Sequence, residues 1–370
     1  MRPAFLRPFH AVVFCCASAL AACAAGGGNA TTGAGGAGGA GSSSQSAGGA
    51  GPSSGSTGGN VSFTTSATGT SSSGGMENFI AYAHINKTLF KLDPNQNNLG
   101  VTKIGDFDCI GGTGEDSSMT DLAVDQTGDL WGISAKNAYH LVITGNTVHC
   151  EKTISLQNVA ATFYGLTFAP ADVFPPSETL IAGNTKGELW QIDTTSGKLT
   201  QHGTFGKVPS NDGHGHSYPS DPTTTGTKAA DSTVGTAWQL SGDIVFLSNN
   251  GSDVGFATVR DCSAKGCSKT DTLIEIDVAA LKTATATTSV TKSVRGQVRK
   301  KSGCASAAAG YGSMYGIAAW NDKVYGFAHA GAIVEIDNTD GSACLVVDMP
   351  ANLWDGAGVT TSAPIIVPPN

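Results

Sequence analysis

The chain has 370 residues and a formal net charge of −8, from 29 acidic and 21 basic side chains. The first 75 residues contain only two of these charges, Arg2 and Arg7, so the body from Met76 onward carries 29 acidic and 19 basic residues, a net charge of about −10. Such a body argues against nucleic acid as a partner, because phosphate contacts need clustered Lys and Arg. About 295 residues are enough for one large all-β domain.

Residues 1–22 have the layout of a secretory signal peptide. Arg2 and Arg7 form a cationic start, and an apolar run extends from Ala11 to Ala22. This run is shorter than the roughly 20 apolar residues that a membrane-spanning helix needs. We therefore expect the segment to be an export signal and not a transmembrane helix.

The four residues LAAC, from Leu20 to Cys23, resemble the lipobox of bacterial lipoproteins. The resemblance implies cleavage before Cys23, acylation of that cysteine and attachment to a lipid membrane, since each buried CH2 group contributes about 0.8 kcal/mol. Ala24 follows, and the absence of Asp at this position implies the outer membrane of a cell envelope. The alternative is an ordinary signal peptide that contains a cysteine by chance.

Residues 23–75 consist of Cys23 followed almost entirely by Gly, Ser, Ala and Thr. Such a segment cannot bury enough apolar surface to offset its backbone entropy, so it is predicted to be a disordered linker. A flexible coil of about 50 residues has a root-mean-square reach near 40 Å. The predicted organisation is therefore a signal peptide (1–22), a lipidated tether (23–75) and one folded domain (76–370).

Four segments of the body share an alternating apolar pattern that ends in Asp. They are TLFKLD (Thr88–Asp93), ELWQID (Glu188–Asp193), TLIEID (Thr272–Asp277) and AIVEID (Ala332–Asp337). Most run into turns rich in Asn, Thr and Gly, which predicts strands followed by hairpin turns. AYHLVIT (Ala138–Thr144) fits the same position less closely, which makes five candidates.

Each later segment follows a pair of strand-like runs and precedes one more, so the repeating unit has four strands. Four short antiparallel strands per repeat are typical of a β-propeller blade. The first unit lacks its innermost strand, and WDGAGVTT (Trp354–Thr361) is a spare one at the other end. We therefore predict an all-β propeller of five blades, in which the C-terminal strand closes the ring. Six or more blades, or a β-sandwich, are the alternatives.

The pattern of strand, Ile-Asp, turn, Gly and strand over residues 77–365 resembles the bacterial propeller superfamily of YVTN-like, NHL-like and regucalcin-like repeats. The resemblance implies the propeller fold and brings no catalytic signature.

Six cysteines lie in the body, and an even number in an exported chain indicates disulfides. The repeat places Cys109 and Cys150, and likewise Cys304 and Cys344, in the outer parts of adjacent blades. We predict the pairs Cys109–Cys150 and Cys304–Cys344 as staples between blades, with Cys262–Cys267 closing a small loop. The alternative for this loop, a metal site, would need more ligands than its sequence DCSAKGC offers.

Alignment of the inner strands places Asp121 and Asp243 at one position, which is Gly in the other blades, with Asp355 one residue earlier. Carboxylates around a channel mouth could hold calcium or act as the acid and base of a hydrolase. The alternative is that Asp121 and Asp243 accept hydrogen bonds from turn amides. Tyr164 and Tyr315, at the starts of inner strands, could stack on a sugar or peptide.

The sequence thus predicts a monomeric, membrane-anchored envelope protein whose propeller binds or scaffolds an extracytoplasmic protein, peptide or glycan. The alternative from another class is a hydrolase or lactonase that uses Asp121, Asp243 and Asp355, with or without calcium. A purely structural envelope protein is the third interpretation. No other cofactor, no nucleic acid and no metal centre is expected.

Replacement of Cys23 by Ser tests the anchor. Because acylation requires the thiol, the Cys23→Ser variant should move from the membrane fraction to the soluble fraction on ultracentrifugation. A conservative change at a leader cysteine, Cys15→Ser, serves as the control and should leave the protein with the membranes. Retention of Cys23→Ser in the membrane fraction would contradict the lipoprotein interpretation.

Overall fold

The computed structural model describes residues 80–93, 96–113, 115–220, 232–249, 252–305, 309–320, 323–361 and 363. The predicted signal peptide (1–22), Cys23 and the tether up to residue 75 lie outside the described residues. What is described is almost entirely β-strand: α1 (Val278–Lys282) and the 3-10 helix η1 (Asn97–Gly100) have five and four residues. None of the helices in this part of the chain has the length and apolar character to cross a membrane.

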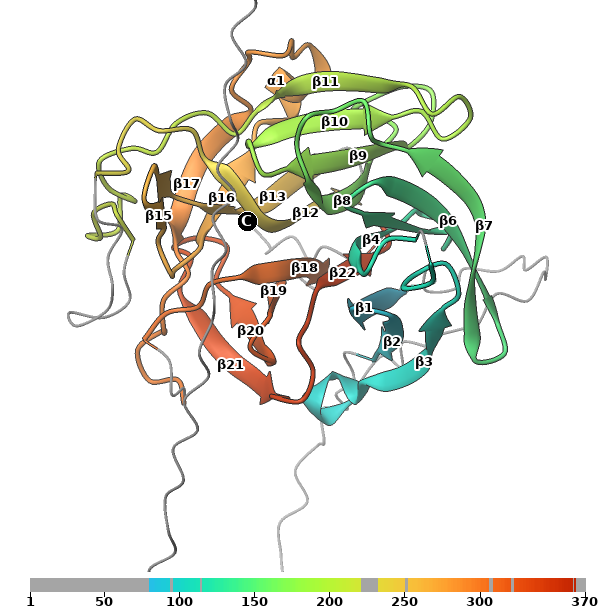
Figure 1. The fold of residues 1–370 in the computed structure, drawn as a ribbon. Coiled ribbons are helices and arrows are strands. Elements are labelled where there is room, and N and C mark those ends of the chain that lie inside the picture. The colour runs from blue at the N-terminus through green and yellow to red at the C-terminus, as the bar shows by residue number, and fades with distance from the viewer. Residues whose placement is uncertain are drawn as a thin grey trace, which may run out of the picture. The chain divides into compact units, whose positions relative to one another are not determined.

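The strands form five four-stranded antiparallel blades arranged around a central axis (Figure 1). A short parallel pairing joins the rims of the first two blades, which together make one eight-stranded sheet. Blade one contains, from the axis outward, β22 (Gly356–Val359), β1 (Ala81–Ile85), β2 (Thr88–Leu92) and β3 (Thr102–Phe107). Blade two contains β4 (Met119–Val124), β5 (Leu130–Ser134), β6 (Asn137–Thr144) and β7 (Thr147–Ser155). Blade three contains β8 (Phe163–Ala169), β9 (Thr179–Asn184), β10 (Glu188–Ile192) and β11 (Leu199–Thr204).

Blade four contains β12 (Gln239–Asn249), β13 (Ser252–Arg260), β16 (Thr272–Ile276) and β17 (Thr291–Gln297). Blade five contains β18 (Met314–Trp320), β19 (Lys323–Ala328), β20 (Ala332–Ile336) and β21 (Ala343–Asp348). A two-stranded hairpin, β14 (Cys262–Ser263) and β15 (Gly266–Cys267), extends from blade four. The protein is a five-bladed β-propeller, as the repeat predicted.

The burial of each strand follows its distance from the axis. In blade two, all five residues of β5 are buried, whereas only Val148 and Ile154 of the nine residues of β7 at the rim are buried. The inner strands are covered on both faces by neighbouring blades and therefore read as continuous apolar runs. The rim strand is largely exposed to solvent.

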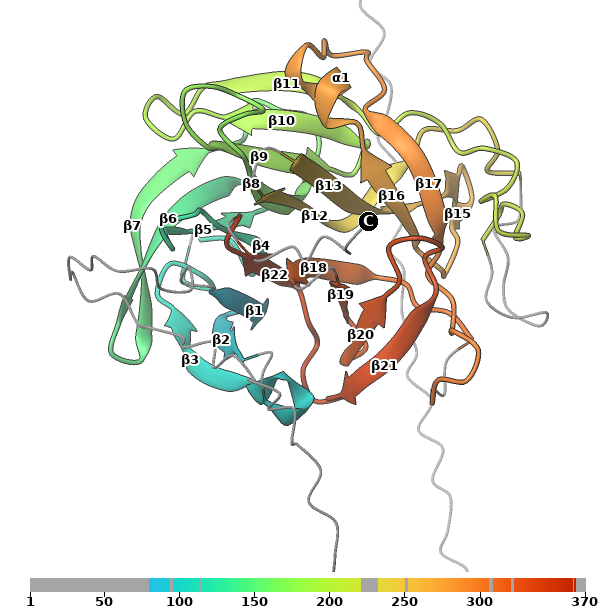
Figure 2. The same cartoon turned by 180° about the vertical axis from the view of Figure 1, so that it is seen from behind.

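The predicted closure of the ring by the C-terminal strand is confirmed. β22 pairs with β1 in antiparallel register, with Ala83 opposite Ala357, and the amide of Thr360 donates to the carbonyl of Ile80. Figure 2, which shows the propeller from behind, places β22, the last strand of the domain, beside β1, its first strand. One blade is thus built from both ends of the domain, and β1 gains a partner strand on its inner side, so the first blade has four strands like the others.

Trp354, just before β22, anchors this closure. Its side chain is fully buried and packs edge-to-face against Phe90 of blade one and Phe327 of blade five, with ring centroids 5.5 and 5.9 Å away. Its indole nitrogen donates to the carbonyl of Gly331 at 3.2 Å. A large ring with a satisfied polar group therefore fills the junction between the first and last blades.

All three predicted disulfides are present. Cys109–Cys150 joins the segment after β3 to β7, and Cys304–Cys344 joins the segment after β17 to β21. Each lies beside a short parallel bridge between the rims of adjacent blades. Cys262–Cys267 closes the β14–β15 hairpin.

The propeller has two distinct ends because successive strands in a blade are antiparallel. The mouth face carries the turn between β1 and β2 and the loops that lead into β4 and β22 (residues 108–118 and 349–355). The entry face carries Ile80, where the described chain begins, and Thr360, close to where it ends. Ile80, the first described residue, therefore lies on the face opposite the mouth face.

Gly242 offers a test of how closely the inner strands approach one another. A Cβ at this position would lie 2.1 Å from the carbonyl oxygen of Met314 and 2.2 Å from the Cα of Tyr315, both backbone atoms of the next blade. Gly242→Ala should therefore lower the free energy of unfolding by about 2 kcal/mol or more, measured by chemical denaturation. Gly145→Ala, in a left-handed turn with open space around it, is the control and should cost only about 1 kcal/mol. An equal loss of unfolding free energy in the two variants would contradict the close approach of the inner strands at Gly242.

Candidate functional site

One position of the inner strands, which the alignment of the five repeats places at the channel mouth, lines the axis of the propeller. The inner strands carry Asp121 and Asp243 there in blades two and four, and Gly356, Gly165 and Gly316 in the other three. In the four inner strands β4, β8, β12 and β18, the pairing with the next strand shifts register at or just before this position. Such bulges re-aim side chains, here toward the axis.

Both axial carboxyl groups accept hydrogen bonds from backbone amides of inner strands. Asp121 accepts from the amide of Leu166 in β8 at 2.6 Å and from that of Ala357 in β22 at 3.2 Å. Asp243 accepts from Ile317 in β18 at 2.7 Å and from its own neighbour Ile244 at 2.5 Å. The alternative given above, turn amides, is corrected here: the donors lie in the strands.

The donors share a pattern that explains this arrangement. Leu166, Ile317 and Ala357 each directly follow the axial glycine of their strand. An innermost strand has no neighbour on its axial side, and a buried amide without an acceptor costs about 1–3 kcal/mol. Two carboxyl groups therefore supply the acceptors that three glycine-containing strands lack.

The two axial carboxyl groups also interact with each other. Burial, followed by the charge of Asp243, raises the pKa of Asp121 well above its usual value, and burial raises the pKa of Asp243 to about 8. Both side chains are fully buried. Two carboxylates without solvent cannot both ionise at low cost, so the pair retains protons that exposed carboxyl groups have lost. This pair joins the inner strands of the blades and is shielded from solvent.

Asp355, the third predicted carboxylate, points away from the pair toward the mouth face. One of its oxygens accepts from the amide of Asn86 at 2.6 Å, and the other lies 3.1 Å from Nδ1 of His329. Burial raises the pKa of Asp355, although the Asn86 amide and the charge of His329 oppose the rise. The structure thus brings Asp121 and Asp243 together and directs Asp355 to a different environment.

The two tyrosines predicted at the mouth lie close to each other and next to His329. The rings of Tyr164 and Tyr315 are stacked with centroids 6.4 Å apart, although they come from blades three and five. The ring of Tyr315 lies 5.1 Å from that of His329, which contacts Asp355. A row of aromatic and ionisable groups therefore leads across the mouth to Asp355.

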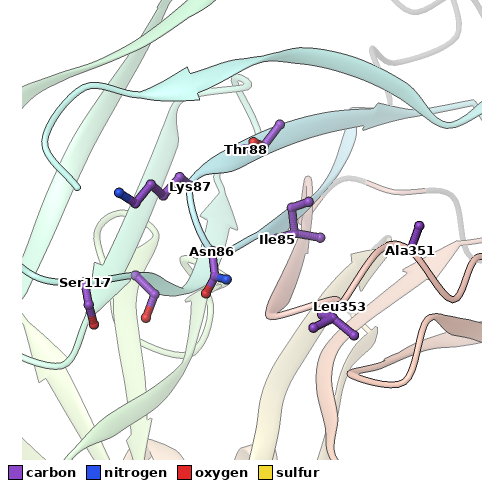
Figure 3. Close-up of a pocket in the computed structure, with 8 residues that line it drawn as sticks. Ile85, Asn86, Lys87, Thr88, Ser117, Ala351 and Leu353 are labelled. Carbon is purple, nitrogen blue, oxygen red and sulfur yellow. The ribbon is translucent and has the colours of Figure 1, made fainter. Parts of the chain in front are cut away.

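A groove with a volume of about 560 Å³ lies on the mouth face beside Asp355 (Figure 3). Its volume falls in the range of small-ligand sites. One end is polar and is lined by Asn86, Lys87, Ser117 and Ser118. In the described part of the chain no ion pair joins Lys87 to another residue, and its Nζ lies against Gly111, where an added Cβ would be 1.8 Å away.

The other end of the groove is apolar. Ile85, Ala351 and Leu353 line it, and Figure 3 shows their side chains on the opposite side of Asn86 from Lys87. Leu353 is 45% exposed, the highest value among the large apolar side chains of the described residues. Its neighbour Trp354 is fully buried, which fixes the backbone that presents Leu353 to solvent.

Sequence reasoning did not find this groove. Its walls come from the first hairpin turn, from the loop between blades one and two, and from the segment before β22. These segments meet only after the ring closes. The signal that could have pointed to them is the spare C-terminal strand, because it places residues 351–353 beside the first turn.

No protein-family model matches the chain, and no curated protein sequence matches it. The chain is similar to the propeller of Dos1, with 10% identity over 74% of this chain and 68% of that chain, at a TM-score of 0.33. It is also similar to a protein of unknown function from Bacteroides caccae, with 8% identity over 76% and 98% of the two chains and a TM-score of 0.35. BamB from Moraxella catarrhalis matches with 12% identity over 71% and 70%, at a TM-score of 0.27.

These similarities concern the fold and assign no function. The fold itself is established by the strand order and register of the five blades.

The axial pair predicts how stability depends on pH. The folded pKa values of Asp121 and Asp243 lie above the value of an exposed Asp, so their contribution is complete at low pH and is lost as the pH rises through about 8. Between pH 5 and 9 the free energy of unfolding should fall by about 1.4 kcal/mol per pH unit for each proton that the pair retains.

Urea unfolding at a series of pH values measures this dependence. Asp121→Asn keeps the shape and removes one of the two interacting acids, so the fall with pH should be smaller than in the unmodified protein. Asp193→Asn, whose carboxyl group is exposed on a turn and has a lowered pKa, should leave the dependence unchanged. A profile that rises steadily with pH in the unmodified protein would contradict the protonated pair.

Proposed function

We propose that the protein is an envelope lipoprotein, anchored through Cys23, whose propeller binds a peptide segment of an extracytoplasmic partner in the groove of the mouth face. The observation that carries the proposal is the two-ended chemistry of this groove. Donors and a cation gather at Asn86, Lys87 and the two serines, and apolar side chains gather at Ile85 and Leu353.

The position of the groove supports an anchored binding module. The described chain begins at Ile80 on the entry face, and the groove lies on the mouth face at the other end of the strands. A tether that joins the entry face leaves the mouth face unobstructed, and the predicted reach of about 40 Å lets the domain turn outward. The outer membrane is the proposed location, since Ala24 follows Cys23.

The ligand that fits both ends is a peptide with an apolar side chain beside a carboxylate. Lys87 and the hydroxyl groups of Ser117 and Ser118 can donate to carboxylate oxygens, a charge-assisted interaction. An apolar side chain that covers Leu353 removes exposed apolar area from water, at about 25 cal/mol per Å². The rest of the mouth, including Tyr164 and Tyr315, can contact the remainder of a peptide or a glycan attached to it.

We do not extend the proposal to a hydrolase or lactonase. Asp121 and Asp243 are fully buried, and all four of their oxygens accept backbone amides.

Selection from a library of random hexapeptides with free carboxyl ends tests the proposal on the full-length protein in detergent. Peptides that end in Leu, Ile or Phe should be enriched, and amidation of their carboxyl end should weaken binding. Leu353→Asp and Lys87→Glu should each weaken binding by about tenfold or more, since either change removes one of the two contacts.

As matched controls, an apolar residue and a lysine near the entry face receive the same charged replacements. Val142→Asp replaces a residue that is 36% exposed, and Lys198→Glu lies in the turn between β10 and β11. Both should bind the selected peptides like the unmodified protein. If the enriched peptides bind the Leu353→Asp and Lys87→Glu variants as tightly as the unmodified protein, the groove is not the binding site.

A further inference from the structure

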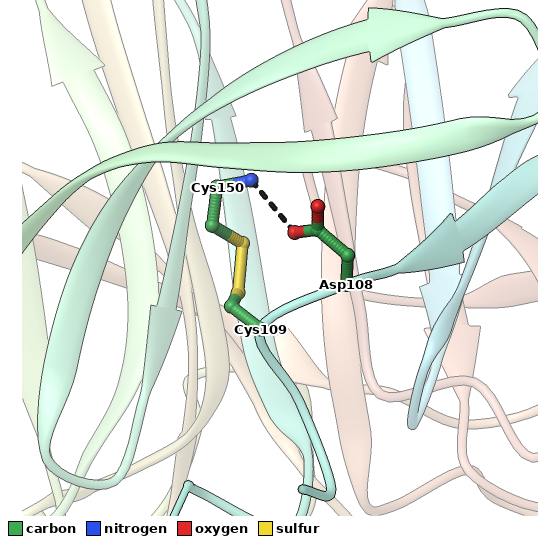
Figure 4. Close-up of side chains that lie close together, drawn as sticks. All are labelled: Asp108, Cys109 and Cys150. Atoms are coloured by element: carbon green, nitrogen blue, oxygen red, sulfur yellow. Dashed lines mark hydrogen bonds between the residues drawn. A yellow bond between two sulfur atoms is a disulfide. The ribbon is translucent and has the colours of Figure 1, made fainter.

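Three groups of different chemistry converge on the rim between blades one and two. A carboxylate oxygen of Asp108 and the sulfur atoms of Cys109 and Cys150 all lie within 4.8 Å of one another (Figure 4). The sulfurs are half-buried, and Asp108 is exposed. In the described residues, this is the one such group of three or more His, Cys, Asp and Glu ligand atoms.

The backbone holds these groups together without help from the disulfide. The amide of Asp108 donates to the carbonyl of Val148 at 3.0 Å, and the amide of Cys150 donates to the Asp108 carboxylate at 3.0 Å. β3 and β7 also pair in parallel, with Asp106 opposite Thr147. Cleavage of the S–S bond would therefore leave both sulfurs beside the carboxylate.

His149 holds the Asp108 side chain in place. Its Nδ1 contacts one oxygen of that carboxylate, while the amide of Cys150 occupies the other. Asp108 is therefore a carboxylate held in place beside two sulfur atoms.

The second disulfide between adjacent blades, Cys304–Cys344, is not part of such a ligand group among the described residues. Cys304–Cys344 also joins the rims of adjacent blades, over a sequence separation of 40 residues where Cys109–Cys150 has 41. Within the described residues, neither Cys304–Cys344 nor Cys262–Cys267 belongs to a three-ligand group. Among the described residues, Glu335 lies opposite Cys344 in the pairing of β20 with β21, but only Cys109–Cys150 belongs to a group of three possible ligands.

We propose that the Cys109–Cys150 disulfide can be exchanged for a zinc site with Cys109, Cys150 and Asp108 as ligands. A dithiol reductant transfers two electrons and two protons to the S–S bond and becomes a disulfide. The two protein thiols then release two protons as Zn²⁺ binds. His149 acts as a positioning residue on Asp108, and a water molecule completes the coordination.

Zinc is the metal that suits this ligand set. It binds thiolates at about 2.3 Å and carboxylates at about 2.0–2.2 Å in tetrahedral geometry. Thiolates disfavour calcium and magnesium, which prefer oxygen. A hydrogen bond from a second residue to a ligating carboxylate typically improves affinity by 10- to 100-fold, which is the role given to His149. In the disulfide form only Asp108 and His149 remain as donors, too few to hold zinc.

The test uses the full chain with Cys15, Cys16 and Cys23 replaced by Ser, reduced by a phosphine in the absence of oxygen and then incubated with Zn²⁺ alone. Elemental analysis should find one zinc per chain after reduction and none before it. Alkylation followed by peptide mapping should show Cys109 and Cys150 protected by zinc, while the other four cysteines react. Equal reaction of all six cysteines would overturn the proposal.

Variants distinguish the loss of a zinc ligand from a loss of folding stability. Asp108→Asn should weaken zinc binding by at least tenfold, and His149→Ala by about tenfold. The double variants Cys304→Ser/Cys344→Ser and Cys109→Ser/Cys150→Ser each lose one staple, so any loss of stability affects both. After reduction, only the Cys304→Ser/Cys344→Ser variant, which retains Cys109 and Cys150, should bind zinc. If both double variants bind zinc equally, or neither binds it, the proposed site is refuted.

Discussion

The hydrogen bonds of Asp121 and Asp243 on the axis are the constraint on which the rest of the structure depends. A propeller leaves the innermost edge of every sheet without a partner, and those amides are buried once the ring closes. Asp121 in blade two bonds to blades three and one, and Asp243 in blade four bonds to blade five. Because the two carboxyl groups also interact with each other, one connected network joins all five inner strands.

This network requires both glycine and aspartate at the axis. Glycines let the inner strands approach closely: a Cβ at Gly356 would lie 2.4 Å from Nε2 of His84 and 2.5 Å from the Asp121 carboxylate. The carboxyl groups then occupy the space that the glycines leave. Burial keeps the pair protonated at neutral pH, so a closed axis is obtained without burying two negative charges.

Closure of the ring also creates the surface that we propose as the binding site. Blade one combines the last strand of the domain with its first three, and Trp354 fills the junction. This brings Leu353 next to the turn at Asn86 and Lys87 and places the groove at the end of the strands opposite Ile80. Ile80, where the described chain begins, and the proposed binding surface therefore lie at opposite ends of the propeller.

The sequence by itself indicated the repeat and the closing strand, and it predicted five blades and the three disulfides, with six or more blades left open. These features are readable because a blade is a local unit: alternation, turn residues and cysteine positions recur within about 50 residues. Only the tertiary structure decided what Asp121, Asp243 and Asp355 contact, because their partners lie in other blades or at the other end of the domain, up to 269 residues away in the chain. The groove and the group around Asp108 were likewise invisible, since each joins segments that carry no shared pattern and meet only when neighbouring blades pack.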